Sequence, residues 1–170
     1  MPDYTIRAAT LADAAAIETL YRTVAEQGGG LARSSAEITA DYVQAFLTRS
    51  LADGVVLVVE QPEGAGLAGE IHAYGSGLRI FAHVLGELTL AIHPRHQGQK
   101  LGYQLFTALL TAVRQRLPHV QRVELLVRES NQRAIALYEK LGFEREGRLL
   151  GRVCTGPGQF EADIPMAWHA

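Results

Sequence analysis

The residues best suited to chemistry lie in one loop, where an apolar strand runs into a long amphipathic helix. The segment reads Ile92-His93-Pro94-Arg95-His96-Gln97-Gly98-Gln99-Lys100-Leu101-Gly102-Tyr103. The first N–H groups of such a helix have no partner within the helix, and the positive end of the helix dipole lies behind them, so they favour an anion. Glycines let a phosphate approach the backbone closely, and Arg95 and Lys100 add positive charge. The loop therefore predicts a phosphate or pyrophosphate site. Any strand–loop–helix connection uses similar residues, however, and neither a P-loop Gly-Lys-Ser/Thr nor a Gly-x-Gly-x-x-Gly pattern is present.

A second segment, Asn131 to Phe143, carries a tyrosine on a short helix. Asn131 is a residue type that caps helices, Ala134 and Tyr138 are spaced to share one helical face, and Gly142 is typical of a helix end. On periodicity alone, Tyr138 is equally well a core tyrosine with a satisfied hydroxyl.

Alternating strand and helix patterns surround these two segments. Helices are predicted from about Thr10 to Gly28, from near Ser34 onward, and at 101–117 and 131–141. Strands are predicted at 4–8, 55–59, 67–74, 84–93, 122–127, from 143 onward, and at 160–168; the stretch 78–94 fits one strand or two. No linker or repeat divides the chain, so residues 1–170 are predicted to form one α/β domain with a mixed sheet.

Composition narrows the function classes. Of 170 residues, 48% are apolar and 20% charged, and the formal net charge is −2, so no bulk charge favours nucleic acid or an anionic membrane. One cysteine, Cys154, cannot form an internal disulfide, and neither a signal peptide nor a spanning apolar run is visible, which makes a cytoplasmic protein the expectation. No metal site is expected, because the histidines His72, His93 and His96 lack ligand spacing and read as surface or loop residues.

Together the two segments resemble the GNAT superfamily of N-acyltransferases. The coenzyme-binding signature of that family, Gln/Arg-x-x-Gly-x-Gly/Ala, maps onto Gln97, Lys100 and Gly102, with Lys100 in place of the central glycine. The second family pattern, Asn-x-x-Ala-x-x-Leu-Tyr-x-x-x-Gly-Phe, is complete from Asn131 to Phe143. If the Lys100 position requires a positive φ, a non-glycine residue adds strain there.

The resemblance implies a fold and a cosubstrate. The fold is a single-domain, mixed and mostly antiparallel central sheet with a splayed parallel strand pair, flanked by about four helices. The cosubstrate is acetyl-CoA, and no metal is needed. The pantetheine arm would pair with the backbone of Leu90, Ala91 and Ile92, and Asn131 would bond to it or to nearby backbone. The pyrophosphate would accept hydrogen bonds from the amides of Gln97, Gly98, Gln99, Lys100, Leu101, Gly102 and Tyr103.

The resemblance also implies direct attack of an amine on the thioester, with a backbone N–H near Ile92 polarising the carbonyl. A free alkylamine is mostly protonated at pH 7, so a general base is expected. Glu87 is the first candidate, against the alternative of a solvated charge at a strand end, and Glu70 and His83 come after it. Tyr138 is the implied general acid, and its transfer of a proton to a thiolate is slightly uphill at reference pKa values of ~10 and ~8.5.

Three functions remain open at this stage. The tail from Gly158 to Met166 looks like that of GNAT members that acetylate small amines or amino acids. The alternatives are acetylation of a protein N-terminus or lysine, and a non-catalytic acyl-CoA-binding module. Arg33 or Arg79 could hold an acceptor carboxylate, although each is more often a surface arginine. The expected partner is a small-molecule amine, and a homodimer is expected only by analogy with similar domains.

Overall fold

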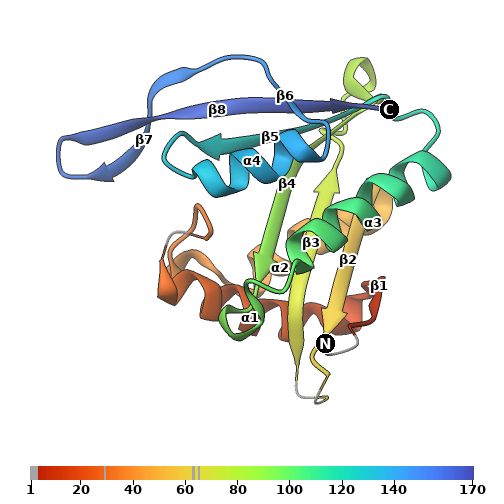
Figure 1. Cartoon of the computed structure of the whole chain (residues 1–170). Helices are drawn as coiled ribbons and strands as arrows, with labels where there is room; N and C mark the ends of the chain where they lie inside the picture. The colour runs from red at the N-terminus through yellow and green to blue at the C-terminus, as the bar shows by residue number, and fades with distance from the viewer. Residues whose placement is uncertain (1–3, 29, 63, 65) are drawn as a thin grey trace.

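The computed structural model describes residues 4–28, 30–62, 64 and 66–170, which form one mixed sheet with helices on both faces (Figure 1). The α-helices are α1 (Ala14–Gln27), α2 (Ala40–Asp53), α3 (Leu101–Arg116) and α4 (Gln132–Lys140). Short 3-10 turns are η1 (Leu11–Asp13), η2 (Ser35–Glu37), η3 (Arg79–Phe81) and η4 (Pro94–His96). The strands are β1 (Ile6–Ala8), β2 (Gly54–Glu60), β3 (Leu67–Tyr74), β4 (Val84–Ile92), β5 (Arg122–Arg128), β6 (Glu144–Arg145), β7 (Leu149–Gly156) and β8 (Gln159–His169).

The strand order in the sheet is β1-β2-β3-β4-β5-β8-β6, and β7 pairs with β8. Every pairing is antiparallel except that between β4 and β5. The parallel pairing covers only Val84 opposite Arg122 and Leu85 opposite Val123. The predicted fold class, a mostly antiparallel sheet with one parallel pair and four flanking helices, is therefore confirmed.

The centre of the sheet is covered on both faces, which explains its nearly continuous apolar strands. Helices α1 and α2 pack on one face, over Val56, Val58 and Tyr74. Helix α3 packs on the other, where Leu105 and Leu109 join a core that continues to β5 and β8. Figure 1 shows α3 crossing in front of β2 and β3 with α2 behind them. None of the helices in the described part of the chain is long and apolar enough to cross a membrane.

The second helix begins later than predicted. Ser34 and Glu37 form their expected capping contacts, with the Ser34 N–H donating to Glu37 Oε2 at 2.8 Å, but these close only the turn η2. Helix α2 starts at Ala40, where Thr39 Oγ1 accepts from the Tyr42 N–H at 3.2 Å. Two capping signals lie five residues apart, and each starts its own element. The stretch 78–94, where one strand or two were predicted, contains one, β4, after the turn η3.

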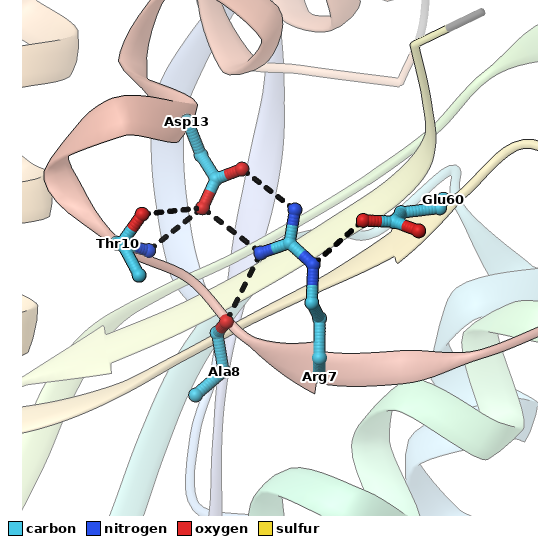
Figure 2. A network of polar contacts seen from close by, with 5 residues as sticks. All are labelled: Arg7, Ala8, Thr10, Asp13 and Glu60. Carbon is cyan, nitrogen blue, oxygen red and sulfur yellow. Dashed lines mark hydrogen bonds and ion pairs between the residues drawn. The ribbon is translucent and has the colours of Figure 1, made fainter. Parts of the chain in front are cut away.

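Arg7 ties the first strand to its neighbours (Figure 2). Its guanidinium makes a two-pronged pair with Asp13, at 2.8 and 3.0 Å, and its Nε donates to Glu60 Oε1 at 2.8 Å. Asp13 also accepts from the Thr10 N–H at 2.7 Å, which caps the turn leading into α1. These bonds, led by that from Arg7, lower the pKa of Asp13 from 3.8 to about 2. The edge strand β1 is thereby fastened to both β2 and the start of α1.

Candidate active site

The parallel pair separates after two residues. Beyond Leu85 and Val123, β5 continues along β8 to Arg128, whereas β4 stays paired only with β3 up to Ile92. Figure 1 shows the two strands diverging from this point. One edge of β4, from Gly86 to Ile92, therefore lacks a strand partner among the described residues. An extended chain could add to that edge by backbone hydrogen bonds.

Beside this edge, the loop before α3 offers unpaired amides. The first backbone bond at the start of α3 runs from Gln104 N–H to the Lys100 carbonyl at 3.1 Å. Gln97, at the start of the predicted pyrophosphate set, donates its N–H to Pro94 instead, at 3.3 Å. The amides with no hydrogen bond to another described residue are those of Gly98, Gln99, Lys100, Leu101, Gly102 and Tyr103. They lie just before and within the first turn of a 16-residue helix, at the positive end of its dipole, an arrangement that favours an anion.

The loop is held in place before any ligand arrives. The Tyr4 hydroxyl donates to Gln99 Oε1 at 2.6 Å and lies 2.7 Å from His96 Nδ1. Lys100 adopts φ 62° and ψ 12°, a left-handed conformation that costs a non-glycine residue roughly 1–2 kcal/mol. Gly98 is also left-handed, with φ 78°. Lys100 therefore stands where the family has a glycine, and it keeps a left-handed backbone conformation that glycine adopts without strain.

Helix α4 lies next to the first turn of α3. Asn131 caps this helix as predicted, its Oδ1 accepting from the Ala134 N–H at 3.2 Å. Gly142 ends the helix with φ 91°. Tyr138 packs its ring against Phe106 and Phe143, at centroid distances of 5.1 and 6.0 Å. Burial raises the pKa of Tyr138 to about 12, and its hydroxyl makes no hydrogen bond within the described part of the chain.

Gly102 marks where the three elements meet. A Cβ added there would lie 3.4 Å from Leu90 Cδ2 of β4 and 3.7 Å from Leu137 Cδ2 of α4. The predicted β4 residues, the first turn of α3 and the Tyr138 helix therefore converge around one position. Leu90 and Gly102, both predicted coenzyme residues, therefore lie next to each other.

Glu87 lies on the other side of β4. It is exposed and has φ 49°, at a bulge that places one extra residue of β4 opposite β3 between the pairs His72–Thr89 and Tyr74–Gly86. Its charge helps to raise the pKa values of Tyr42 and Tyr74, after the larger effect of burial, so these groups lie in one neighbourhood.

Two arginines cover the same two phenol rings. The Arg33 guanidinium lies 4.2 Å from the Tyr42 ring centroid, and that of Arg49 lies 4.4 Å from the Tyr74 ring centroid. Arg33 was predicted as an acceptor contact, whereas Arg49 was not. Neither forms an ion pair with a carboxylate of the described residues, and Arg49 Nη2 donates to the Gly75 carbonyl at 3.2 Å. The other predicted arginine, Arg79, lies exposed in η3.

The reading of His72 as a surface or loop residue is wrong. It lies inside β3 with 2% of its side chain exposed, and Glu70 beside it is fully buried. His72 Nδ1 lies 3.0 Å from Glu70 Oε1, and the Tyr21 hydroxyl donates to Glu70 Oε2 at 2.5 Å. The signal available in the sequence was the Glu-x-His spacing, which puts two ionisable groups on one face of a strand that is otherwise apolar. His83, the other secondary candidate, is exposed before β4.

Both non-glycine residues with positive φ among the described residues, Glu87 and Lys100, are predicted site residues. Backbone strain of this kind persists only where the surrounding structure enforces it, and it collects at functional sites. The strained positions thus lie near the start of β4, at Glu87, and at the end of the loop that joins β4 to α3, at Lys100.

Comparisons with known proteins agree with this geometry. A model of the GNAT family of acetyltransferases matches residues 33–143. Among solved structures, the yncA protein of Salmonella typhimurium with its cofactor acetyl-CoA has a TM-score of 0.83 at 24% identity, over 98% of this chain and 94% of that one. A ribosomal-protein-alanine N-acetyltransferase from Brucella melitensis has a TM-score of 0.82 at 24% identity, over 98% and 99% of the two chains. A phosphinothricin acetyltransferase from Sinorhizobium meliloti in complex with acetyl-CoA has a TM-score of 0.80 at 19% identity, over 99% and 89%. No curated protein matches. The structural likenesses show the fold, and the family model spans more than half of the sequence, so the chain belongs to the GNAT family of acetyltransferases.

Proposed function

We propose that this acetyltransferase moves the acetyl group of acetyl-CoA to the primary amine of a small molecule or an amino acid. The observation that carries the proposal is the unpaired edge of β4 beside a row of unpaired amides at the start of α3. An extended arm with a pyrophosphate at one end needs such a pair of features. The unpaired amides suit the pyrophosphate, and the absence of a side chain at Gly102 leaves room for the arm between Leu90 and Leu137.

Acetyl-CoA supplies an acetyl group that is activated as a thioester. The backbone of Leu90 and Ile92 on the open edge would hold the arm, whereas Ala91, predicted with them, turns its backbone groups toward Glu70 of β3. The amides from Gly98 to Tyr103 would hold the pyrophosphate. Lys100 adds a positive charge at the same loop. Asn131 contributes by fixing the start of α4, since its side chain is engaged with Ala134.

Tyr138 faces a demanding proton transfer. With its pKa at about 12 and a reference thiol at ~8.5, donating its proton to a thiolate is uphill by roughly 3.5 pKa units, or about 5 kcal/mol. In our proposal, Tyr138 therefore keeps its proton and stabilises the leaving group by a hydrogen bond.

The acceptor would enter from the α1–α2 face. There Glu87 attracts and holds the ammonium form of an amine, while Arg33 and Arg49, which have no carboxylate partner among the described residues, provide cations for a carboxylate. An acceptor that carries both groups is an amino acid or a similar small molecule. A phosphinothricin acetyltransferase among the structural relatives supports this class, and a ribosomal-protein-alanine acetyltransferase among them keeps a protein N-terminus as the competing acceptor.

Calorimetric titration of acetyl-CoA, with free coenzyme A and ATP as controls, tests the first half of the proposal. We expect acetyl-CoA and coenzyme A to bind and ATP not to bind. Thiol release with a set of amino acids, polyamines and N-terminal peptides then tests the acceptor. Failure of acetyl-CoA to bind near millimolar concentration would remove the proposal, and release with peptides alone would replace the small amine by a protein.

A further inference from the structure

Three buried side chains on the acceptor face form a connected unit that the proposed function leaves unused. Glu70 and His72 come from β3, and Tyr21 comes from α1. All three are at most 2% exposed. Burying a carboxylate is costly unless hydrogen bonds compensate, and a purely apolar filling of such a site is often at least as stable. Packing alone therefore does not account for this unit.

With Glu70 as a carboxylate, the hydrogen bonds assign the tautomer of His72. The Tyr21 hydroxyl has one proton, and its short 2.5 Å contact directs that proton to Glu70 Oε2. Burial raises the pKa of Tyr21 well above its usual value, so the proton stays there. An ionised Glu70 accepts only, so the 3.0 Å contact to Oε1 requires a proton on His72 Nδ1. The lone pair of the imidazole is therefore on Nε2.

Nε2 is the one polar atom of the unit with no hydrogen bond to another described residue. Phe46 stacks on the imidazole at a centroid distance of 4.0 Å and an angle of 14°, which fixes the plane of the ring. A carboxylate on one nitrogen, a fixed ring and a free lone pair on the other nitrogen are the arrangement of the histidine base in a Ser-His-Asp triad.

The unit lies one strand from the reaction site. His72 is opposite Thr89 of β4, and Glu70 is opposite Ala91. Neighbouring strands are about 4.8 Å apart. The other edge of this same part of β4 is the unpaired edge assigned to the acetyl donor. A chain added at that edge would lie two strand spacings from β3, so the proton transfer proposed below runs through water.

We propose that His72 is the general base that deprotonates the acceptor amine, through a bridging water, with Glu70 and Tyr21 as positioning residues. This rests on the proposed function. The N–H bond of the ammonium breaks and its electron pair stays on nitrogen. The proton passes to the water while that water gives a proton to Nε2. The product is a neutral amine, an unchanged water and an imidazolium that faces the Glu70 carboxylate, and the imidazolium then returns its proton to solvent. Glu87 keeps the role of attracting the ammonium.

Several titratable groups lie around His72 and contribute to its electrostatic environment. Tyr21 from α1 and Glu70 and Tyr74 from β3 lie against it, and Tyr42 from α2 and Glu87 from β4 lie near Tyr74. The arginines Arg33 and Arg49 lie farther out over the phenol rings.

The test is the pH profile of kcat/KM for the best amine, in full-length wild-type protein and three variants. His72→Asn retains a donor for Glu70 but has no basic nitrogen. We expect it to lose the rise of activity with pH on the acid side of the wild-type profile and to fall about 100-fold at pH 7. The loss should shrink below about tenfold at pH 10, where the amine deprotonates in solution. Glu70→Gln should weaken the rise, and Glu87→Gln should raise KM while the rise remains.

Two results would overturn the assignment: a rise that survives in His72→Asn and disappears in Glu87→Gln, or a loss in His72→Asn that is equal at every pH. Acetyl-CoA calorimetry on each variant separates a lost base from a lost fold or coenzyme site. If the wild-type protein binds acetyl-CoA but acetylates no amine, the proposed function fails together with this role. Should His72→Asn not fold, 15N-histidine NMR of the wild-type protein decides: Nε2 must be the unprotonated nitrogen near pH 8, and an Nε2–H tautomer contradicts the proposal.

Discussion

Replacing Lys100 separates two effects that the sequence combines in one residue. Lys100→Gly removes both the charge and the strain of a left-handed backbone at φ 62°, while Lys100→Ala removes only the charge. The strain costs roughly 1–2 kcal/mol, and the greater freedom of glycine in the unfolded chain offsets about 0.5–1 kcal/mol of the gain. We therefore expect Lys100→Gly to be more stable than Lys100→Ala by about 0.5–1 kcal/mol. For a chain of this size, that is a Tm about 1–4 °C higher.

Coenzyme binding should respond differently, because folding has already imposed the strain before the ligand arrives. Both variants lose the same exposed charge, so both should bind acetyl-CoA at most about fivefold more weakly, and equally. Thermal unfolding and calorimetry on the matched pair measure the two effects. A Lys100→Ala protein as stable as Lys100→Gly would refute the left-handed geometry. Binding that differs by tenfold between the two would show that this backbone is set by the ligand.

Three further perturbations address other parts of the molecule. Tyr138→Phe should lower kcat about 10- to 100-fold with little change in acetyl-CoA affinity. Because the pKa of Tyr138 is about 12, its ionisation should cause no loss of wild-type kcat between pH 8 and 10. A decline of kcat in that range that is absent from Tyr138→Phe would contradict this. The folded pKa of Asp13, about 2, is below its unfolded value of 3.8, so the stability it contributes is present above pH ~4 and is lost as the pH falls towards 2. Because the Arg7 side chain is 36% exposed and solvent screens the pair, Asp13→Asn should lower the free energy of unfolding by only about 1 kcal/mol at pH 7. Tm curves of the two proteins should converge near pH 2. Gly102→Val should weaken acetyl-CoA binding at least tenfold in calorimetry, because its branches must enter the space between Leu90 and Leu137, whereas Gly102→Ala meets only ordinary contacts at 3.4 and 3.7 Å and should stay within about threefold.

The fold was accessible from sequence wherever a signal was local. The helix from Asn131 to Gly142 has its cap and its terminating glycine within the segment, and both appear where predicted. The continuous β-branched, apolar run at 55–59 likewise predicts a strand buried on both faces, and β2 is such a strand. The start of α2 was missed because Ser34 and Thr39 are both good caps, and local pattern does not say which one begins the long helix.

The buried unit on β3 shows what local reasoning cannot reach. Tyr21 and Glu70 are 49 residues apart, and nothing in their spacing says that they touch. Metal-ligand spacing was the wrong criterion for His72, because its partner Glu70 orients it by a hydrogen bond rather than by sharing a cation. The period of two in Glu70-x-His72 marked the face, but only the packing of α1 and α2 shows that this face is buried.

The bulge at Glu87 connects the fold to the site. It falls directly after the last parallel pair, Leu85 with Val123, and it places an extra residue on β4. A bulge bends its strand and increases the local twist, which turns β4 away from β5 and leaves the edge open. Glu87 therefore acts through its backbone whatever its carboxylate does. Glu87→Gln keeps a side chain of the same shape on the same strained backbone and tests the charge alone. Glu87→Gly would relax the strain as well, so a change in that variant says nothing about the carboxylate.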